Sequence, residues 1–196
     1  MSGFFKNVWF RCISVLLLIA LVSGGLLAVL NDVLYVSDEE RTGRAIKKIY
    51  GEQTEYSVVL DADKNADDAV VYEKYGKIEK YFNVGSDMLF KVTGMKGYKD
   101  GTVTLWVKVA DKNGKKVIDK VILESFEKQT LMSKLDGTFY DRFLVDVTDG
   151  YFTSSVNAGS GEISNPVTGA TKSATAAVNA VNCVIKYVNS LSGGEQ

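Results

Sequence analysis

An uncharged stretch near the N-terminus constrains the fold of this chain more than any other feature. Residues 12–30 carry no charged side chain and consist mostly of Leu, Ile, Val and Ala. These 19 residues are close to the ~20 that an α-helix needs to cross a bilayer. Trp9 and Tyr35 stand at the two ends, where aromatic side chains favour the membrane interface. We therefore predict that residues 1–35 hold a short cytoplasmic segment and a single transmembrane helix.

The charges around this stretch predict its orientation. Basic residues precede it and acidic residues follow it: Lys6 and Arg11, then Asp32, Asp38, Glu39 and Glu40. Segments rich in Lys and Arg stay on the cytoplasmic side of a membrane. We therefore expect a single-pass protein of the cell (inner) membrane, with Met1 in the cytoplasm and residues 36–196 forming one extracytoplasmic domain.

A cleaved signal peptide is the alternative to a retained anchor. The apolar run exceeds the ~7–15 residues of a signal core, and no clear small-x-small cleavage site follows it. Cys12 begins the run, whereas a lipoprotein signal would end on its cysteine. We therefore favour the anchor. Ser23, Gly24 and Gly25 either allow a second helix to approach closely or are simply tolerated within the span.

The amino-acid composition excludes several kinds of chemistry. The chain has no histidine, which removes Ser-His and Cys-His nucleophile pairs, His-ligated haem and most catalytic zinc sites. Its two cysteines, Cys12 and Cys183, cannot form a four-cysteine metal centre. A net charge of −1 gives no overall attraction to nucleic acid. Demanding chemistry would therefore need an organic cofactor, and we expect neither catalytic side chains nor a metal site.

The patterns in the rest of the chain predict an α+β domain with an antiparallel sheet, because strands and helices do not alternate regularly. Residues 102–110 give the clearest strand signal, with apolar side chains at every second position, and residues 111–114 form a turn into a return strand. A loop is expected at 158–166, and Gly193 and Gly194 end the last helix. The expected helices are 41–50, closed by Gly51, a short one near Tyr140, and 172–190; the expected strands are 56–60, 70–75, 81–83, 89–92, 102–110 and 116–123.

An acidic loop at residues 61–68 invites a calcium-site hypothesis. An EF-hand loop that began at Asp61 would need glycine at its sixth position and glutamate at its twelfth. Ala66 and Tyr72 occupy those positions. We therefore interpret the segment as a solvated loop.

A turn of small, hydroxyl-bearing residues leads directly into the last helix. Residues 168–178 read Thr-Gly-Ala-Thr-Lys-Ser-Ala-Thr-Ala-Ala-Val. Thr171 would lie beside the unpaired amides of a helix N-terminus, where the helix dipole favours a phosphate group. The alternative is that Thr171 is an ordinary helix N-cap.

These residues resemble a known family, the FMN-binding domain of the Rnf complex G subunit and of NqrC. The family places a Ser/Thr-Gly-Ala-Ser/Thr-x-Ser/Thr motif before its last helix, and residues 168–173 match every specified position. Lys96, Gly97, Tyr98 and Gly101 are similar to the segment that leads into its β hairpin. In the family's Glu-Thr-Pro-Gly-Leu-Gly loop, only Glu127 and Leu131 match, and Asn165 replaces an aspartate that usually opens the attachment motif.

The resemblance implies that a flavin transferase esterifies the phosphate of FMN to Thr171. Tyr98, Trp106 and Phe126 are candidates to flank the flavin ring, although aromatic residues on strands belong more often to the core. Cys183 reads as a small buried hydrophobe. The cofactor-binding residues expected from the resemblance are Thr171, Thr168, Gly169, Ala170, Lys172, Ser173, Glu127, Thr130, Leu131 and Tyr98.

The resemblance further implies an electron-transfer subunit of an ion-translocating ferredoxin:NAD⁺ oxidoreductase of the Rnf type, without a complete active site on this chain. Its partners would be the other membrane subunits. Three alternatives stay open: an NqrC-type subunit, a stand-alone anchored FMN carrier, and an anchored binding domain without a cofactor.

Overall fold

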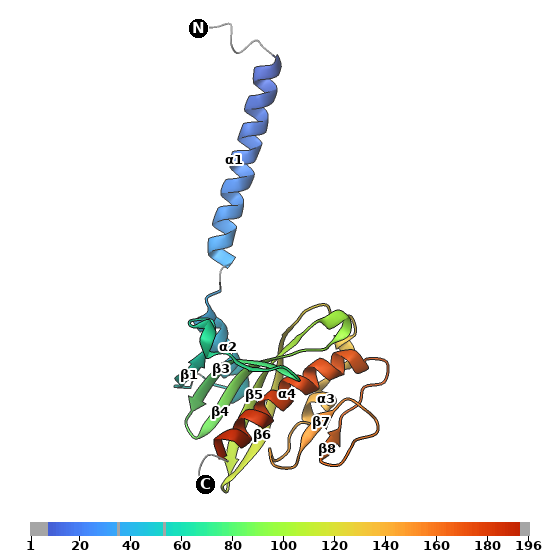
Figure 1. Cartoon of the computed structure of the whole chain (residues 1–196). Helices are drawn as coiled ribbons and strands as arrows, with labels where there is room; N and C mark the ends of the chain where they lie inside the picture. The colour runs from blue at the N-terminus through green and yellow to red at the C-terminus, as the bar shows by residue number, and fades with distance from the viewer. Residues whose placement is uncertain (1–7, 35, 53, 193–196) are drawn as a thin grey trace. The chain divides into compact units, whose positions relative to one another are not determined.

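A computed structural model describes residues 8–34, 36–52 and 54–192, and the chain divides into two compact units, Met1–Arg44 and Ala45–Gln196. In the first unit, α1 (Val8–Leu34) is long and apolar enough over Trp9–Asn31 to cross a membrane (Figure 1). The expectations for Lys6, Tyr35, Gly193 and Gly194, and for the side chain of Asp32, fall outside the described residues.

The second unit is built on an antiparallel sheet, as predicted. Its strands follow the order β1-β3-β4-β5-β6, and β2 pairs with β3 (Figure 1). The strands are β1 (Ser57–Asp61), β2 (Val70–Tyr72), β3 (Gly76–Val84), β4 (Asp87–Gly94), β5 (Val103–Lys112) and β6 (Lys115–Phe126).

The β5–β6 hairpin is tighter than the four-residue turn that the sequence predicts. The strands continue to Lys112 and Lys115, so only Asn113 and Gly114 form the turn. Both have positive φ angles, 59° and 80°, and this conformation follows the right-handed twist of the strands. The ladder continues through exposed lysines, where the apolar alternation has already ended.

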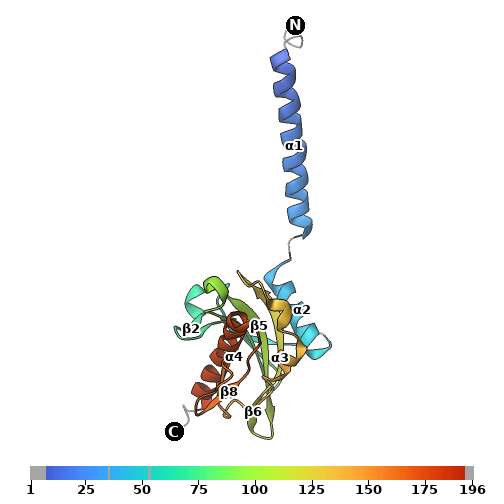
Figure 2. The same cartoon turned by 90° about the vertical axis from the view of Figure 1, so that its right-hand side faces the viewer.

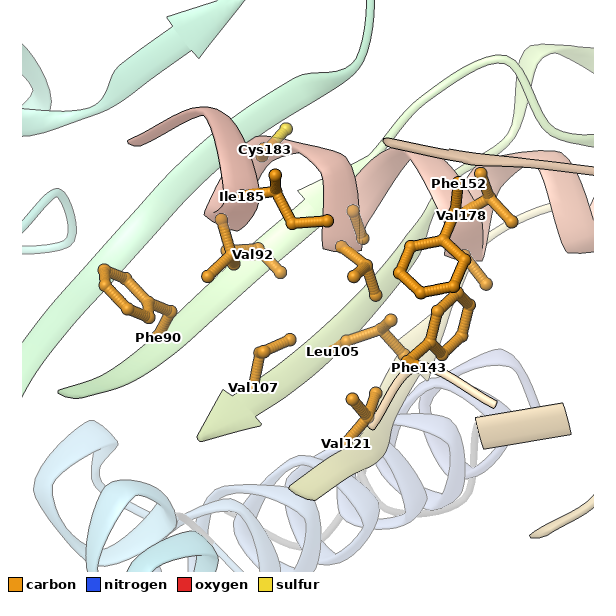
Figure 3. Packing of buried hydrophobic residues seen from close by; sticks show 14 of the residues in the cluster. Phe90, Val92, Leu105, Val107, Val121, Phe143, Phe152, Val178, Cys183 and Ile185 are labelled. Carbon is orange, nitrogen blue, oxygen red and sulfur yellow. The ribbon is translucent and has the colours of Figure 1, made fainter. Parts of the chain in front are cut away.

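Helix α4 (Thr171–Ser192) packs across one face of the sheet and forms the main core (Figures 1 and 3). The predicted apolar positions of β5, including Leu105 and Val107, are fully buried beneath it. Closest approach occurs at Gly94 of β4, where an added Cβ would lie 1.9 Å from the carbonyl oxygen of Ala176. Cys183 is buried in this core, as predicted.

The opposite face of the sheet carries a second, smaller cluster. Ala45, Ile46 and Ile49 of α2 (Asp38–Tyr50) pack there against Phe82 and Trp106. Strand β5 is therefore buried on both faces. Trp106 stacks on Phe82 with the ring centroids 6.1 Å apart and donates a hydrogen bond to Glu124.

The region before α4 contains more structure than the sequence predicts. A short helix near Tyr140 is confirmed as α3 (Gly137–Asp141). The loop predicted at 158–166 contains β8 (Glu162–Ser164), which pairs in parallel with β7 (Tyr151–Thr153), so this prediction was wrong in part (Figure 1; β8 is also labelled in Figure 2). The side-chain amide of Asn182 on α4 bonds both backbone groups of Phe152, at 2.8 and 2.9 Å, and thereby holds β7.

Candidate functional site

A cavity of about 450 Å³ lies at the N-terminal end of α4. Three segments far apart in sequence supply its walls: the turn η3 (Tyr98–Asp100), the loop at 130–131, and residues 169–173. All eight lining residues belong to the set that the family resemblance names: Tyr98, Thr130, Leu131, Gly169, Ala170, Thr171, Lys172 and Ser173. The volume falls within the ~300–1,000 Å³ typical of small-molecule sites.

Thr171 is the first residue of α4, and its side chain is exposed. Ala170 occupies the N-cap position, because its carbonyl oxygen accepts the first helical hydrogen bond, from Ala174 at 2.9 Å. Across the described part of the chain, the Thr171 hydroxyl has no hydrogen-bond partner. Thr171 is therefore not the ordinary N-cap that the alternative interpretation required, and its hydroxyl is available to a ligand.

The turn before α4 brings Thr171 to the cavity. Gly169 has a φ of +76°, a conformation that favours glycine. A Cβ at this position would also lie 2.7 Å from Nζ of Lys134. Glycine therefore serves both the turn and the close approach of a lysine ammonium to the start of the helix.

The first turn of α4 offers backbone donors beside Thr171. Within the ranges that the structure describes, the amides of Thr171, Lys172 and Ser173 have no backbone acceptor, as the first amides of a helix do. Lys172 is exposed, whereas Ser173 is only 3% exposed and donates a 2.9 Å hydrogen bond to Oε1 of Gln129. The helix dipole adds positive potential at this end.

Two of the expected binding residues do not line the cavity. Thr168 is exposed in the turn that precedes Gly169. Glu127 is exposed at the end of the β5–β6 ladder, where its backbone exchanges hydrogen bonds with Thr102. The structure therefore does not bring these two residues into the cavity lining.

The aromatic candidates separate into different environments. Tyr98 lines the cavity and keeps 39% of its surface exposed. Trp106 lies on the opposite face of the sheet and cannot flank a ligand in this cavity. Phe126 is exposed but does not line the cavity.

Asn165, which stands where the family usually has aspartate, is fully buried and structural. It donates a side-chain hydrogen bond to the carbonyl of Phe139 at 3.2 Å and accepts one from Arg142 at 3.4 Å. Its backbone N–H donates to Thr153 at 2.8 Å. Asn165 thus ties the segment that leads into the turn before α4 to α3 and β7.

Sequence reasoning missed Gln129 and Lys134. Gln129 is 7% exposed and forms four hydrogen bonds around the cavity. In the sequence it reads as a departure from the family's loop. Lys134 stands 35 positions before Gly169, and no periodic pattern joins the two residues. Only the folded chain brings them together.

Nucleophilic and metal chemistry has little support elsewhere. Burial raises the pKa of the Cys183 thiol to about 12 and the pKa of Tyr140 to about 12, so both stay protonated at neutral pH. In the acidic loop, Asp61 and Asp63 pair with Lys80 at 3.2 and 2.7 Å. Among the described residues, no group of three or more acidic or cysteine side chains could hold a metal ion.

No protein-family model matches this chain, and no curated protein matches it in sequence. A functional proposal for this chain therefore rests on the cavity and its lining residues.

Proposed function

We propose that this chain is a single-pass membrane flavoprotein that carries FMN covalently on Thr171 and relays electrons within an Rnf-type complex. One observation carries the proposal: the Thr171 hydroxyl, which has no hydrogen-bond partner among the described residues, lines a cavity beside helix amides that have no backbone acceptor there. A phosphate ester at that oxygen would lie where backbone donors and the helix dipole favour negative charge.

The residues around the cavity suit both ends of FMN. Lysines without an ion pair in the described part of the chain lie on or beside the lining segments: Lys96, Lys99, Lys128, Lys134 and Lys172. Their positive charges would favour binding of the FMN phosphate. Tyr98 and Leu131, each 39% exposed, offer apolar surface that a flavin ring would cover.

Attachment would be a phosphoryl-transfer step catalysed by a separate flavin transferase. Oγ1 of Thr171 would attack the FMN phosphorus of a flavin dinucleotide, and a new O–P bond would form. The bond to the second phosphate would break, a nucleoside monophosphate would leave, and the hydroxyl proton would pass to a base of the transferase. The free amides of α4 would stabilise the phosphate oxygens throughout.

Bound FMN would supply one- and two-electron transfer, while the protein supplies position and electrostatics. An ester prevents loss of the cofactor outside the cell, and α1 would hold the flavin near membrane-embedded partners. Oxidoreductase activity would then belong to the assembled complex. Genes for the other membrane subunits beside this one would favour the Rnf or NqrC type over a stand-alone carrier.

The test is to express the full chain with a flavin transferase and to examine a denaturing gel under ultraviolet light. We expect a fluorescent band for the wild type and none for Thr171→Ala. Thr175→Ala is the matched control, because its hydroxyl is already bonded to the Thr171 carbonyl at 2.8 Å and it should remain labelled. An unlabelled wild-type band would instead support the cofactor-free alternative.

A further inference from the structure

The side-chain amide of Gln129 joins the three segments that form the cavity. Its Oε1 accepts hydrogen bonds from the Tyr98 amide at 3.1 Å and from the Ser173 hydroxyl at 2.9 Å. Its Nε2 donates to the carbonyls of Glu127 at 3.0 Å and Tyr98 at 3.5 Å. One buried group therefore connects the loop, the η3 turn and the first turn of α4.

The partners of Gln129 fix the orientation of its amide. A backbone N–H needs an acceptor, and two carbonyl oxygens need donors, so the oxygen and nitrogen positions cannot be exchanged. Both lone pairs of the oxygen and both N–H groups are engaged. The two carbonyls also accept from the Thr102 and Gly101 amides, so a change that replaces the Nε2 donor by an oxygen is costly mainly because it sets that oxygen against two carbonyl oxygens in a site shielded from water.

The backbone around Gln129 is adapted to hold this amide. A Cβ on Gly97 would lie 2.4 Å from Nε2, and a Cβ on Gly101 would lie 2.5 Å from the same atom. Two segments contact the Gln129 amide, residues 96–101 and residues 127–129. They contain every described non-glycine residue with a positive φ except Asn113: Lys96, Lys99, Asp100 and Lys128. Strained backbone of this kind persists only where surrounding contacts enforce it.

We propose that Gln129 is a positioning residue that sets the cavity walls against Thr171 and so determines how well the flavin is accepted. This inference rests on the proposed function. Gln129 acts through Tyr98 and Ser173, which line the cavity, and does not itself touch the reacting oxygen. A small displacement of either wall would move the flavin away from the attachment geometry.

The test compares Gln129→Glu with Asn182→Asp in the full chain. Each variant converts a buried amide that donates to a backbone carbonyl into a carboxyl group of the same shape. Asn182 lies on α4, 11 residues after Thr171, which is ~16 Å along the helix axis. The rate of flavin labelling is measured beside the unfolding transition of the unlabelled protein.

We expect Gln129→Glu to slow labelling by about tenfold or more relative to the wild type, while Asn182→Asp labels at the wild-type rate. The deficit of Gln129→Glu should shrink between about pH 8 and about pH 6, because the buried new carboxyl takes up a proton and regains one donor. The visible circular dichroism of the labelled fraction should change only in Gln129→Glu.

The positioning role would be overturned if both variants were labelled at the same rate, or if the labelling rate of each variant fell in proportion to its loss of thermal stability. Either result would leave the proposed function intact. An unlabelled wild type would overturn the proposed function itself. If Gln129→Glu does not fold, Ser173→Ala removes a single hydrogen bond to Oε1. It should still slow labelling by more than its modest loss of thermal stability explains, and an unchanged rate would contradict the proposal.

Discussion

At the scale of single residues, the hydroxyl of Thr171 does not cap its own helix. Thr171 stands one position inside α4, while a buried alanine takes the N-cap. Helices usually place a hydroxyl or carboxylate at the cap, where it satisfies free amides. Within the described residues, the first amides of α4 have no backbone acceptor and the hydroxyl lines the cavity, so both are available to one anionic group.

Thr171→Ala should therefore leave the fold almost unchanged. The lost hydroxyl has no described partner, and alanine is the better helix former. We expect the free energy of unfolding to change by less than about 0.5 kcal/mol, measured by denaturant unfolding of the detergent-solubilised chain. A loss of more than ~1 kcal/mol would indicate that the hydroxyl caps the helix after all.

Lys134 should assist flavin attachment through its charge. Its ammonium lies against Gly169, at the start of α4. We expect Lys134→Gln to slow labelling by roughly two- to fivefold at low salt, and the deficit to shrink at high salt because screening weakens exposed charges. Lys47→Gln, which removes an exposed charge from α2, is the control and should label normally. A deficit that does not respond to salt would contradict an electrostatic role.

At the scale of elements, the contact between β4 and α4 fixes where the cavity forms. Gly94 permits that contact, because an added Cβ would overlap the Ala176 carbonyl and lie 2.4 Å from the Ala180 amide. The backbone atoms at this contact cannot move aside as a flexible side chain would. The start of α4 is therefore placed by a contact near its middle.

Gly94→Ala should destabilise the unit by about 3 kcal/mol or more, because the core would be overpacked against backbone. Gly137→Ala is the matched control, since nothing lies within 4 Å of its added Cβ. It should be neutral or stabilising by up to ~1 kcal/mol. Equal effects of the two variants on the unfolding midpoint would contradict this view of the contact.

The ion pairs of β6 predict how stability depends on pH. Hydrogen bonds from Lys112 and Lys108 hold the pKa of Asp119 below its ordinary value. Such a group stabilises the fold above its unfolded pKa of ~3.9, and the contribution disappears as pH falls through the lower folded pKa. Asp119→Asn should cost about 1 kcal/mol at neutral pH and progressively less below about pH 4. An equal loss of unfolding free energy at neutral pH and below about pH 4 would contradict a stabilising role for the Asp119 ion pairs.

The elements that the sequence predicts well are those with a sustained pattern. The alternation in β5 and the helical spacing in α4 continue through most of each element. β7 and β8 have only three residues each, too few for a pattern to be distinguished. They depend on Asn182, whose partner Phe152 lies 30 residues away in sequence.

The site was predictable to the extent that it is local. Residues 168–173 form a contiguous motif, and the cavity lining includes most of it. Gln129 and Lys134 could not be found in this way, because their roles arise from contacts across 44 and 35 residues. The loop that departs most from the family resemblance contributes the amide that joins the cavity walls.

At the scale of the whole molecule, the chain combines one helix that is long and apolar enough to cross a membrane with one folded α+β unit. We propose that α1 is retained as an anchor and that the folded unit lies outside the cell membrane. That arrangement would confine a tethered electron carrier to the membrane surface.

The chain should accordingly remain in the membrane fraction after high-salt washing and be released only by detergent. Protease added to the extracytoplasmic side should degrade the region from residue 36 onward and spare the N-terminus. Reporter fusions at each end would check the orientation. Release into the soluble fraction after removal of an N-terminal segment would indicate a cleaved signal peptide instead.

The central claim is that Thr171 carries FMN, and mass spectrometry of the protein isolated from its own membranes tests it most directly. After proteolysis, the peptide that contains Thr171 should carry the mass of FMN less one water, with fragment ions that assign it to the threonine oxygen. An unmodified Thr171 peptide, or a flavin on any other residue, would contradict the account.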